Sequence, residues 1–360
     1  MTLAESAPPR LRSIGLGELL DQAVRLYRRN FTRFIGMLAL VQVPLALLQL
    51  GVSFLTSAGY VERMQDPFAL QSTDPFEALG AGYFAGIGAS LLLAIIAFLA
   101  IQGVAAAALT RAIADSYLGR PPGILEAYRR VGRSWVDLVL ALLLAGIIVL
   151  ALSLWATFIP CLGWFSGPGI LAFLTMGVIP LMAPVIVLER RGATAGLRRA
   201  WDLARSRFWW VMGFLLVLTV FSQVVVGGPS ALLGVAISFL GGDPVSNLPL
   251  RTLAQSLVSV AFGLLYYPLH LTAIALLYFD LRVRSEGFDL SLSAEGAKGE
   301  PLDVATVAST APTSAVRPLL TWPEVGNFAL ASVLVFVGFG ILMLVYMMLG
   351  LLPLMASGGA

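Results

Sequence analysis

The sequence has few of the side chains that carry most enzyme chemistry. Its 360 residues include one cysteine, Cys161, and one histidine, His270. A single cysteine excludes an intramolecular disulfide and any zinc site built on several thiolates, and a single histidine removes most triad and metal chemistry. The sequence also lacks a Walker A loop and the HExxH, CxxC, GxSxG and dinucleotide-binding motifs. We therefore predict no catalytic residue, no metal site and no cofactor, and a protein that is not an enzyme.

Charged residues are scarce as well. They make up 12% of the chain, against roughly a quarter in an ordinary globular protein, while 58% of the residues are hydrophobic. The formal net charge is only +3, and no unbroken basic tract is present, so we expect no nucleic-acid partner. So much apolar surface exceeds what one water-facing core can bury, which indicates that lipid is part of the solvent of this chain.

Long uncharged stretches predict an all-α integral membrane protein with seven transmembrane helices. Each stretch reaches the roughly 20 residues that a helix needs to cross a bilayer. The stretch 138–188 is too long for one crossing and is interrupted by Pro160 and Gly163, so it predicts a helical hairpin. The ten residues 231–240 are too short to cross and could be interfacial, re-entrant or an extension of the helix before them. The expected spans are 34–57, 83–110, 138–159, 169–188, 208–227, 253–279 and 327–353.

The distribution of basic residues predicts the orientation. Segments 1–33, 111–137, 189–207 and 280–326 carry 21 of the 23 Lys and Arg residues, and the loops between them carry only Arg63 and Arg251. Basic segments stay in the cytoplasm, so the N-terminus is predicted to be cytoplasmic and the C-terminus outside. We expect the protein in the cytoplasmic (inner) membrane of a bacterium.

A repeated pattern precedes spans one, three and five. Aligning Phe31, Trp135 and Phe208 places an alanine eight residues earlier in each case, and the apolar positions −11, −8, −4 and 0 share one helical face. Arginines occupy much of the opposite face, which predicts a basic amphipathic helix on the membrane surface. The aligned positions are Leu20, Ile124 and Leu197; Ala23, Ala127 and Ala200; and Tyr27, Val131 and Ala204.

This pattern suggests a six-span core, residues 1–285, made of three repeats of an interfacial helix and a helical hairpin at about 15–115, 120–191 and 194–285. Residues 286–325 are rich in Ser, Ala, Thr, Pro and Glu with little periodicity, and are predicted to be a flexible cytoplasmic linker. The seventh helix, within 326–360, follows as an appendage.

Six arginines on the interfacial helices form a candidate lipid or partner surface. One interpretation is topological: arginines anchor the helices on anionic headgroups, worth about 1 kcal/mol per charge. The alternative is a docking site for a protein partner or a specific anionic lipid. The residues are Arg28, Arg29, Arg129, Arg130, Arg198 and Arg199.

Polar but uncharged side chains lie inside the predicted spans, where no formal charge is found. Glutamines in a helix bundle commonly hydrogen-bond across helices, at about 0.6 to 2 kcal/mol each, so a purely structural role explains them. A ligand site in a cavity between proline-kinked helices is the alternative. His270 is either a satisfied bundle histidine or a ligand contact. The candidate intramembrane residues are Gln42, Gln49, Gln102, Gln223 and His270, with Gln255 in span six.

Three segments resemble a family of bacterial multi-pass proteins related to the membrane domain of glycerophosphoryl diester phosphodiesterases: 17–31 (GELLDQAVRLYRRNF), 183–213 (APVIVLERRGATAGLRRAWDLARSRFWWVMG) and 275–290 (ALLYFDLRVRSEGFDL). In the enzymes that name this family, the membrane part accompanies a soluble catalytic barrel. That barrel is absent here, so the resemblance implies no catalytic residue, and the seventh span departs from the six-span core.

Taken together, the sequence favours a non-enzymatic membrane protein that scaffolds, anchors or regulates a partner, or contributes to envelope-lipid homeostasis. The alternative is a transporter or lipid-moving protein with a cavity between kinked helices. The sequence does not predict the oligomeric state.

Overall fold

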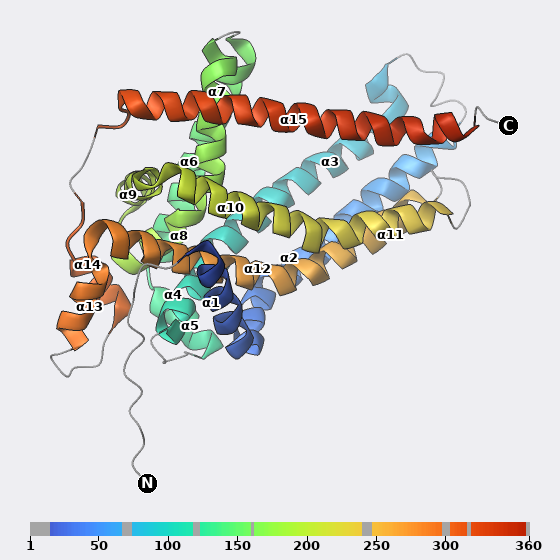
Figure 1. The fold of residues 1–360 in the computed structure, drawn as a ribbon. Coiled ribbons are helices and arrows are strands. Elements are labelled where there is room, and N and C mark those ends of the chain that lie inside the picture. The colour runs from blue at the N-terminus through green and yellow to red at the C-terminus, as the bar shows by residue number, and fades with distance from the viewer. Residues whose placement is uncertain are drawn as a thin grey trace.

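The structure, a computed structural model, describes residues 15–66, 74–117, 123–159, 162–239, 247–296, 303–314 and 318–357. Throughout these ranges the regular elements are helices (Figure 1). Cys161 and the turn-forming Pro160 lie outside them. The all-α fold class predicted from the sequence is confirmed.

Seven helices in the described ranges are long and apolar enough to cross a membrane, as predicted. Three of them contain a π-helical turn, a feature common near functional sites. The spans are α2 (Phe31–Met64); α3 (Pro75–Leu99) with η2 (Ala100–Ala105) and α4 (Ala106–Tyr117); α6 (Ser134–Phe158); α7 (Leu162–Ala172) with η3 (Phe173–Val178) and α8 (Ile179–Glu189); α10 (Phe208–Ser222) with η4 (Gln223–Gly227) and α11 (Gly228–Phe239); α12 (Leu248–Glu286); and α15 (Trp322–Ser357).

Most spans are longer than the sequence predicts. Helix α12 continues past residue 279 to Glu286 and so includes charged residues that were placed outside the span. Its 39 residues exceed the roughly 20 that a bilayer core requires, so α12 is long enough to span the core with its charged end outside. The segment beginning at residue 231 belongs to α11, which continues α10 through η4; the interpretation as an extension of the preceding helix is confirmed for the described residues.

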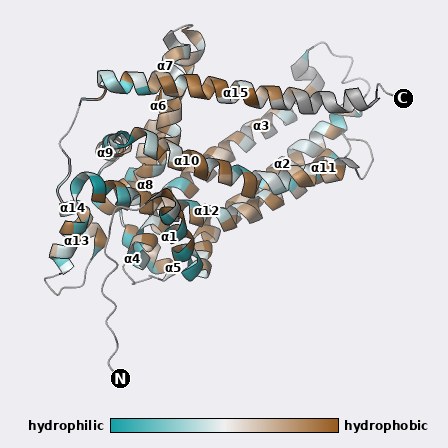
Figure 2. Ribbon diagram, viewed as in Figure 1, coloured by the Kyte–Doolittle hydropathy of each residue, from teal (hydrophilic) through white to brown (hydrophobic). Residues whose placement is uncertain are grey.

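The three basic amphipathic helices are present as α1 (Leu16–Arg29), α5 (Ile124–Val131) and α9 (Ala193–Ser206). The aligned alanines Ala23, Ala127 and Ala200 are fully buried, as the shared face requires. Hydrophilic residues are concentrated on α1, α5 and α9, whereas α10 is mostly hydrophobic (Figure 2). We call the end of the bundle that carries these helices the basic end. The three-repeat organisation stays a prediction.

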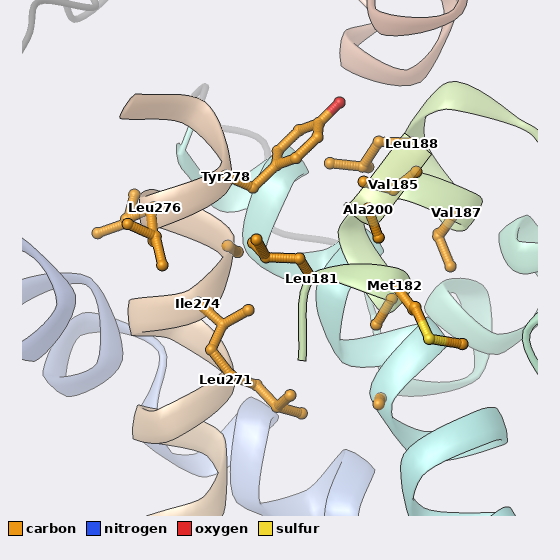
Figure 3. Packing of buried hydrophobic residues seen from close by; sticks show 14 of the residues in the cluster. Leu181, Met182, Val185, Val187, Leu188, Ala200, Leu271, Ile274, Leu276 and Tyr278 are labelled. Carbon is orange, nitrogen blue, oxygen red and sulfur yellow. The ribbon is translucent and has the colours of Figure 1, made fainter. Parts of the chain in front are cut away.

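The core lies where α8 and α12 face each other near the basic end. Leu181 and Val185 of α8 point toward Leu271 and Ile274 of α12 (Figure 3), and all four are buried. Helix α4 approaches through a run of small residues, Ala106–Ala108, which lets helix backbones pack closely in a membrane. This contact holds the ends of spans two, four and six together.

The segment 286–325, predicted to be a flexible linker, contains two helices, α13 (Phe288–Gly296) and α14 (Val304–Thr310). Val304, Val307 and Ala308 are buried at helical spacing, and α14 packs against α8. Asp303 begins α14 by accepting a hydrogen bond from the Ala305 amide, as N-cap residues do. We call residues 303–314 and 318–324 the strap.

The seventh span touches the rest of the molecule mainly through the first third of α15, against α7 (Figure 1). The Gly169 amide donates a hydrogen bond to the Ser332 hydroxyl oxygen at 2.8 Å. A Cβ on Gly169 would overlap the Phe328 carbonyl oxygen, so only glycine permits this approach. Beyond Ser332, the described side chains of α15 are exposed and apolar, as expected for a helix in lipid.

Candidate functional site

The strongest candidate site is a polar cavity of about 460 Å³ between α2, α3–η2, α11 and α12. We call it the amide cavity. Half of its lining residues carry an amide or hydroxyl group, and none carries a charge. The polar members are Gln42, Gln49 and Ser53 of α2, Ser230 of α11, and Gln255, Ser256 and Ser259 of α12.

Helical spacing explains how α2 contributes to this cavity. Gln42 and Gln49 are seven residues apart and Ser53 follows four residues later, so the three share one face. Two glycines lie beside the glutamines that line the cavity. A Cβ on Gly234 would overlap the Gln255 amide, whereas a Cβ on Gly263 would only touch the amide of Gln42 at 3.5 Å.

The glutamines of this cavity are not all used as links between helices. Gln255 donates to the Ser230 carbonyl at 3.3 Å, joining α12 to α11. Within the described ranges, no partner is recorded for the side chains of Gln42 and Gln49. Both side chains are half-buried, so their amide groups remain open to hydrogen bonds from water or from a polar solute in the cavity.

A second, mostly apolar cavity of about 450 Å³ lies between α3–η2, α6, η3–α8, α10 and α12. We call it the histidine cavity. Its polar lining residues are Gln102, Thr175, Thr219 and His270, and the remainder includes Phe98, Leu142, Pro180 and Leu271. Sequence reasoning selected Gln102 and His270 separately; the structure brings them to one cavity.

Gln223 is the one candidate glutamine that joins neither of these two cavities. It lies in η4, where its side-chain oxygen approaches Gly227 of the same turn. Gln223 therefore serves as a control position for the other glutamines, because it lies in a span but lines neither cavity.

At the basic end, five buried residues form an ion network that joins α8, α9 and α12: Glu189, Arg199, Tyr278, Arg282 and Glu286. Arg199 bridges the two glutamates, at 3.1 Å from Glu189 and 2.6 Å from Glu286. Arg282 donates to Glu286 at 2.9 Å and to the Tyr278 hydroxyl at 3.1 Å. Two arginines and two glutamates balance in charge, as burial requires.

This network corrects one sequence prediction. Arg199, a candidate for the lipid or partner surface, has a side chain only 6% exposed, whereas its neighbour Arg198 is 27% exposed and pairs with Asp202. Burial alone would lower the pKa of Arg199, but hydrogen bonds and charges from Glu286 and Glu189 raise it above its ordinary value. Arg199 is therefore a charged internal link and cannot contact headgroups.

The other surface candidates divide into two groups. Arg28, Arg29 and Arg129 are exposed on α1 and α5. Arg130 is half exposed but forms ion pairs with Glu126 and, at 3.3 Å, with Asp115.

Tyr128 attaches α5 to the first span. Burial raises the pKa of Tyr128 to about 12, and its hydroxyl donates to the Met37 carbonyl of α2 at 2.7 Å. This bond fixes α5 against the first span.

The strap is held by arginines from several helices. Arg111 of α4 pairs with Asp303 at 2.5 Å, and Arg190 reaches the same carboxylate at 3.6 Å. Arg282 donates to the Ala308 carbonyl at 3.0 Å, and Arg205 of α9 donates to the Pro318 carbonyl at 2.6 Å. Burial raises the pKa of Asp303, but Arg111 together with hydrogen bonds from Thr306 and Ala305 lowers it below its ordinary value.

Sequence reasoning missed the serines and threonines of the two cavities. Hydroxyl side chains in helices often donate to a carbonyl one turn earlier, and Thr175 and Thr219 do so at 2.7 and 2.8 Å. Because such hydrogen bonds occur in any helix, a serine or threonine in a span gives by itself no sequence signal that it also lines a cavity. The available signal was the spacing of Gln49 and Ser53, and of Gln255 and Ser259, which places each pair on one helical face.

Acidic and metal-binding residues form no alternative site in the described ranges. No group of three or more His, Cys, Asp or Glu side chains that could hold a metal ion is found there. Comparison with protein-family models, with curated proteins and with solved structures found no match. The resemblance to the phosphodiesterase membrane-domain family therefore stays a prediction.

Proposed function

We propose that this protein binds an uncharged polar solute, or the uncharged polar part of a lipid, in the amide cavity and moves it within or across the membrane. The proposal is a role in transport or lipid handling without catalysis. The observation that carries it is the pair of amides, Gln42 and Gln49, that face a cavity between spans and have no recorded partner in the described structure.

The chemistry of the lining selects the class of ligand. Amides both donate and accept, and hydroxyls do the same, so the cavity suits a molecule with several hydroxyl, amide or ether groups. An ionic ligand would lack a counter-charge there, because none of the lining residues is ionisable, and an unpaired ion at membrane depth is strongly disfavoured.

A second candidate function, the anchoring or regulation of a partner at the basic end, is supported by the exposed arginines Arg28, Arg29 and Arg129. These charges suit anionic headgroups or an acidic partner protein. The burial of Arg199 and the docking of the strap reduce this surface, so we place the scaffold role second.

The cellular setting belongs to the same proposal. We place the protein in a bacterial cytoplasmic membrane with the basic end inside and the C-terminus outside, on the distribution of arginines. The resemblance of segments 17–31, 183–213 and 275–290 to the phosphodiesterase membrane domains supports a link to lipid or envelope homeostasis.

Reconstitution into proteoliposomes tests the proposal. One arm measures the uptake of small uncharged polyols by light scattering, and a second measures the transbilayer movement of a fluorescent lipid with an uncharged headgroup. We expect flux in one arm and its loss in the Gln42→Leu, Gln49→Leu double variant. The matched control is Gln223→Leu, which should keep wild-type flux; equal flux in wild type and the double variant would refute the proposal.

A further inference from the structure

The histidine cavity has features of a second ligand site that are independent of the amide cavity. We infer that it binds a long-chain lipid alcohol, that is, an uncharged amphiphile whose hydroxyl donates a hydrogen bond to His270 while its hydrocarbon chain lies along the apolar wall. The inference does not depend on the proposed transport function, because the two cavities share no lining residue.

The hydrogen bonds of Tyr266 determine which nitrogen of His270 can accept. The Tyr266 hydroxyl donates its only proton to the Leu218 carbonyl at 2.6 Å. Its oxygen also lies 3.4 Å from Nδ1 of His270, so in that contact the imidazole must be the donor. A neutral imidazole with its proton on Nδ1 carries its lone pair on Nε2.

The other polar groups of the cavity also offer acceptors. Thr175 and Thr219 donate their hydroxyl protons to the carbonyls of Leu171 and Leu215, which leaves lone pairs on the hydroxyl oxygens. Gln102 adds an amide that both accepts and donates. The cavity therefore complements a ligand that brings a proton donor.

Tyr267 places a further polar group in this region. Its ring stacks on His270, with 6.1 Å between centroids. Its hydroxyl oxygen is buried and lacks a hydrogen-bond partner in the described part of the chain, although it lies near Gln102. Tyr267 thus adds a polar atom beside Gln102, one of the residues that line the cavity.

The remaining lining excludes other ligand classes. Apolar side chains such as Phe98, Leu142 and Leu271 dominate it, which disfavours a small hydrophilic solute. No lining residue is cationic, so a fatty acid carboxylate or a phosphate would lack a counter-charge. The volume lies within the roughly 300 to 1,000 Å³ typical of small-molecule sites. These conditions leave an uncharged lipid with a hydroxyl group.

Photolabelling of the full-length protein in lipid nanodiscs tests this inference. The probe is a long-chain primary alcohol with a diazirine in its chain, and labelled peptides are mapped by mass spectrometry. We expect labelling within 175–183 and 270–274, competed by the unlabelled alcohol but three- to tenfold less well by its methyl ether, which cannot donate; this factor corresponds to one hydrogen bond.

Three variants make the result specific. His270→Phe should lower the apparent affinity for the alcohol about three- to tenfold, and His270→Gln, which restores an acceptor, should recover much of it. Gln42→Leu, in the other cavity, should bind the alcohol normally. Equal competition by alcohol and ether, or labelling spread over lipid-facing helices such as α15, would overturn the inference whatever the outcome of the flux assay.

Discussion

Ile101 and Gln102 are adjacent in η2, yet Ile101 lines the amide cavity and Gln102 lines the histidine cavity. One π-helical span is thus the wall between the two sites. Ala97 and Phe98, one turn earlier, divide in the same way. Neighbouring helical residues point about 100° apart, which explains how a single helix serves both cavities.

This arrangement predicts that the two sites can be disabled separately. Ile101→Phe places a larger side chain in the amide cavity and so reduces its free volume. We expect solute or lipid flux to fall at least severalfold, while photolabelling by the lipid alcohol stays intact. Gln102→Leu should do the reverse. Parallel flux and labelling measurements on both variants check this, and a loss of both activities in either variant would contradict separate sites.

The position of Gly234 beside Gln255 predicts the effect of a small substitution on the amide cavity. A methyl group there would overlap the Gln255 amide, so Gly234→Ala should displace this flexible side chain and break its bond to the Ser230 carbonyl. We expect reduced flux with a loss of stability of about 1 kcal/mol. Gly88→Ala is the control, because no atom lies within 4 Å of the added carbon.

Adjacent arginines on α9 predict a large difference in stability. Arg199→Gln leaves Glu189 and Glu286 buried with one cation fewer, which typically costs about 3 to 5 kcal/mol. Arg198→Gln removes a partly exposed pair with Asp202 and should cost about 0 to 1 kcal/mol. Unfolding titrations in detergent micelles compare the two; similar losses would show that Arg199 is not the internal link described here.

Asp303 predicts a dependence of strap docking on pH. Its pKa in the folded protein is lowered, so its contribution is fully present above its unfolded pKa of about 3.9 and is lost as the pH falls through the folded value. A fluorophore on Ser309→Cys, in a protein with Cys161→Ala, should report release of α14 in that acidic range. Asp303→Asn should show weaker docking at neutral pH and little of this acid transition; an unchanged transition would contradict the assignment.

The docking of the seventh span predicts sensitivity at Gly169. Gly169→Ala should push α15 away from α7, because the added carbon overlaps the Phe328 carbonyl. Backbone hydrogen exchange at residues 328–332 should then increase at least severalfold and the melting temperature should fall. Gly326→Ala, on α15 itself, has no atom near the added carbon and should behave as wild type.

The sequence was sufficient for the parts of this fold that follow from local periodicity. Uncharged runs located all seven spans, and the apolar face of α1, α5 and α9 located Ala23, Ala127 and Ala200 in the core. The spacing of Gln42 and Gln49 placed them on one face of α2. Each of these depends only on residues within one helix.

The parts that failed depend on which helices pack together. Arg198 and Arg199 are equivalent in the charge pattern, and only the positions of Glu189 and Glu286 on α8 and α12 decide which of them is internal. The polar composition of 286–325 obscured the short apolar series of Val304, Val307 and Ala308. The amide cavity required α2, α11 and α12 to meet, which no single segment encodes.

The strap has a consequence for biogenesis. Its anchoring groups come from the second, fourth, fifth and sixth spans or the segments beside them, through Arg111, Arg190, Arg205 and Arg282. These groups must already be neighbours before the strap can bind. In a chain with one misinserted hairpin, the strap therefore cannot dock. The strap, and the helix α15 that follows it, can therefore dock only on a correctly assembled bundle.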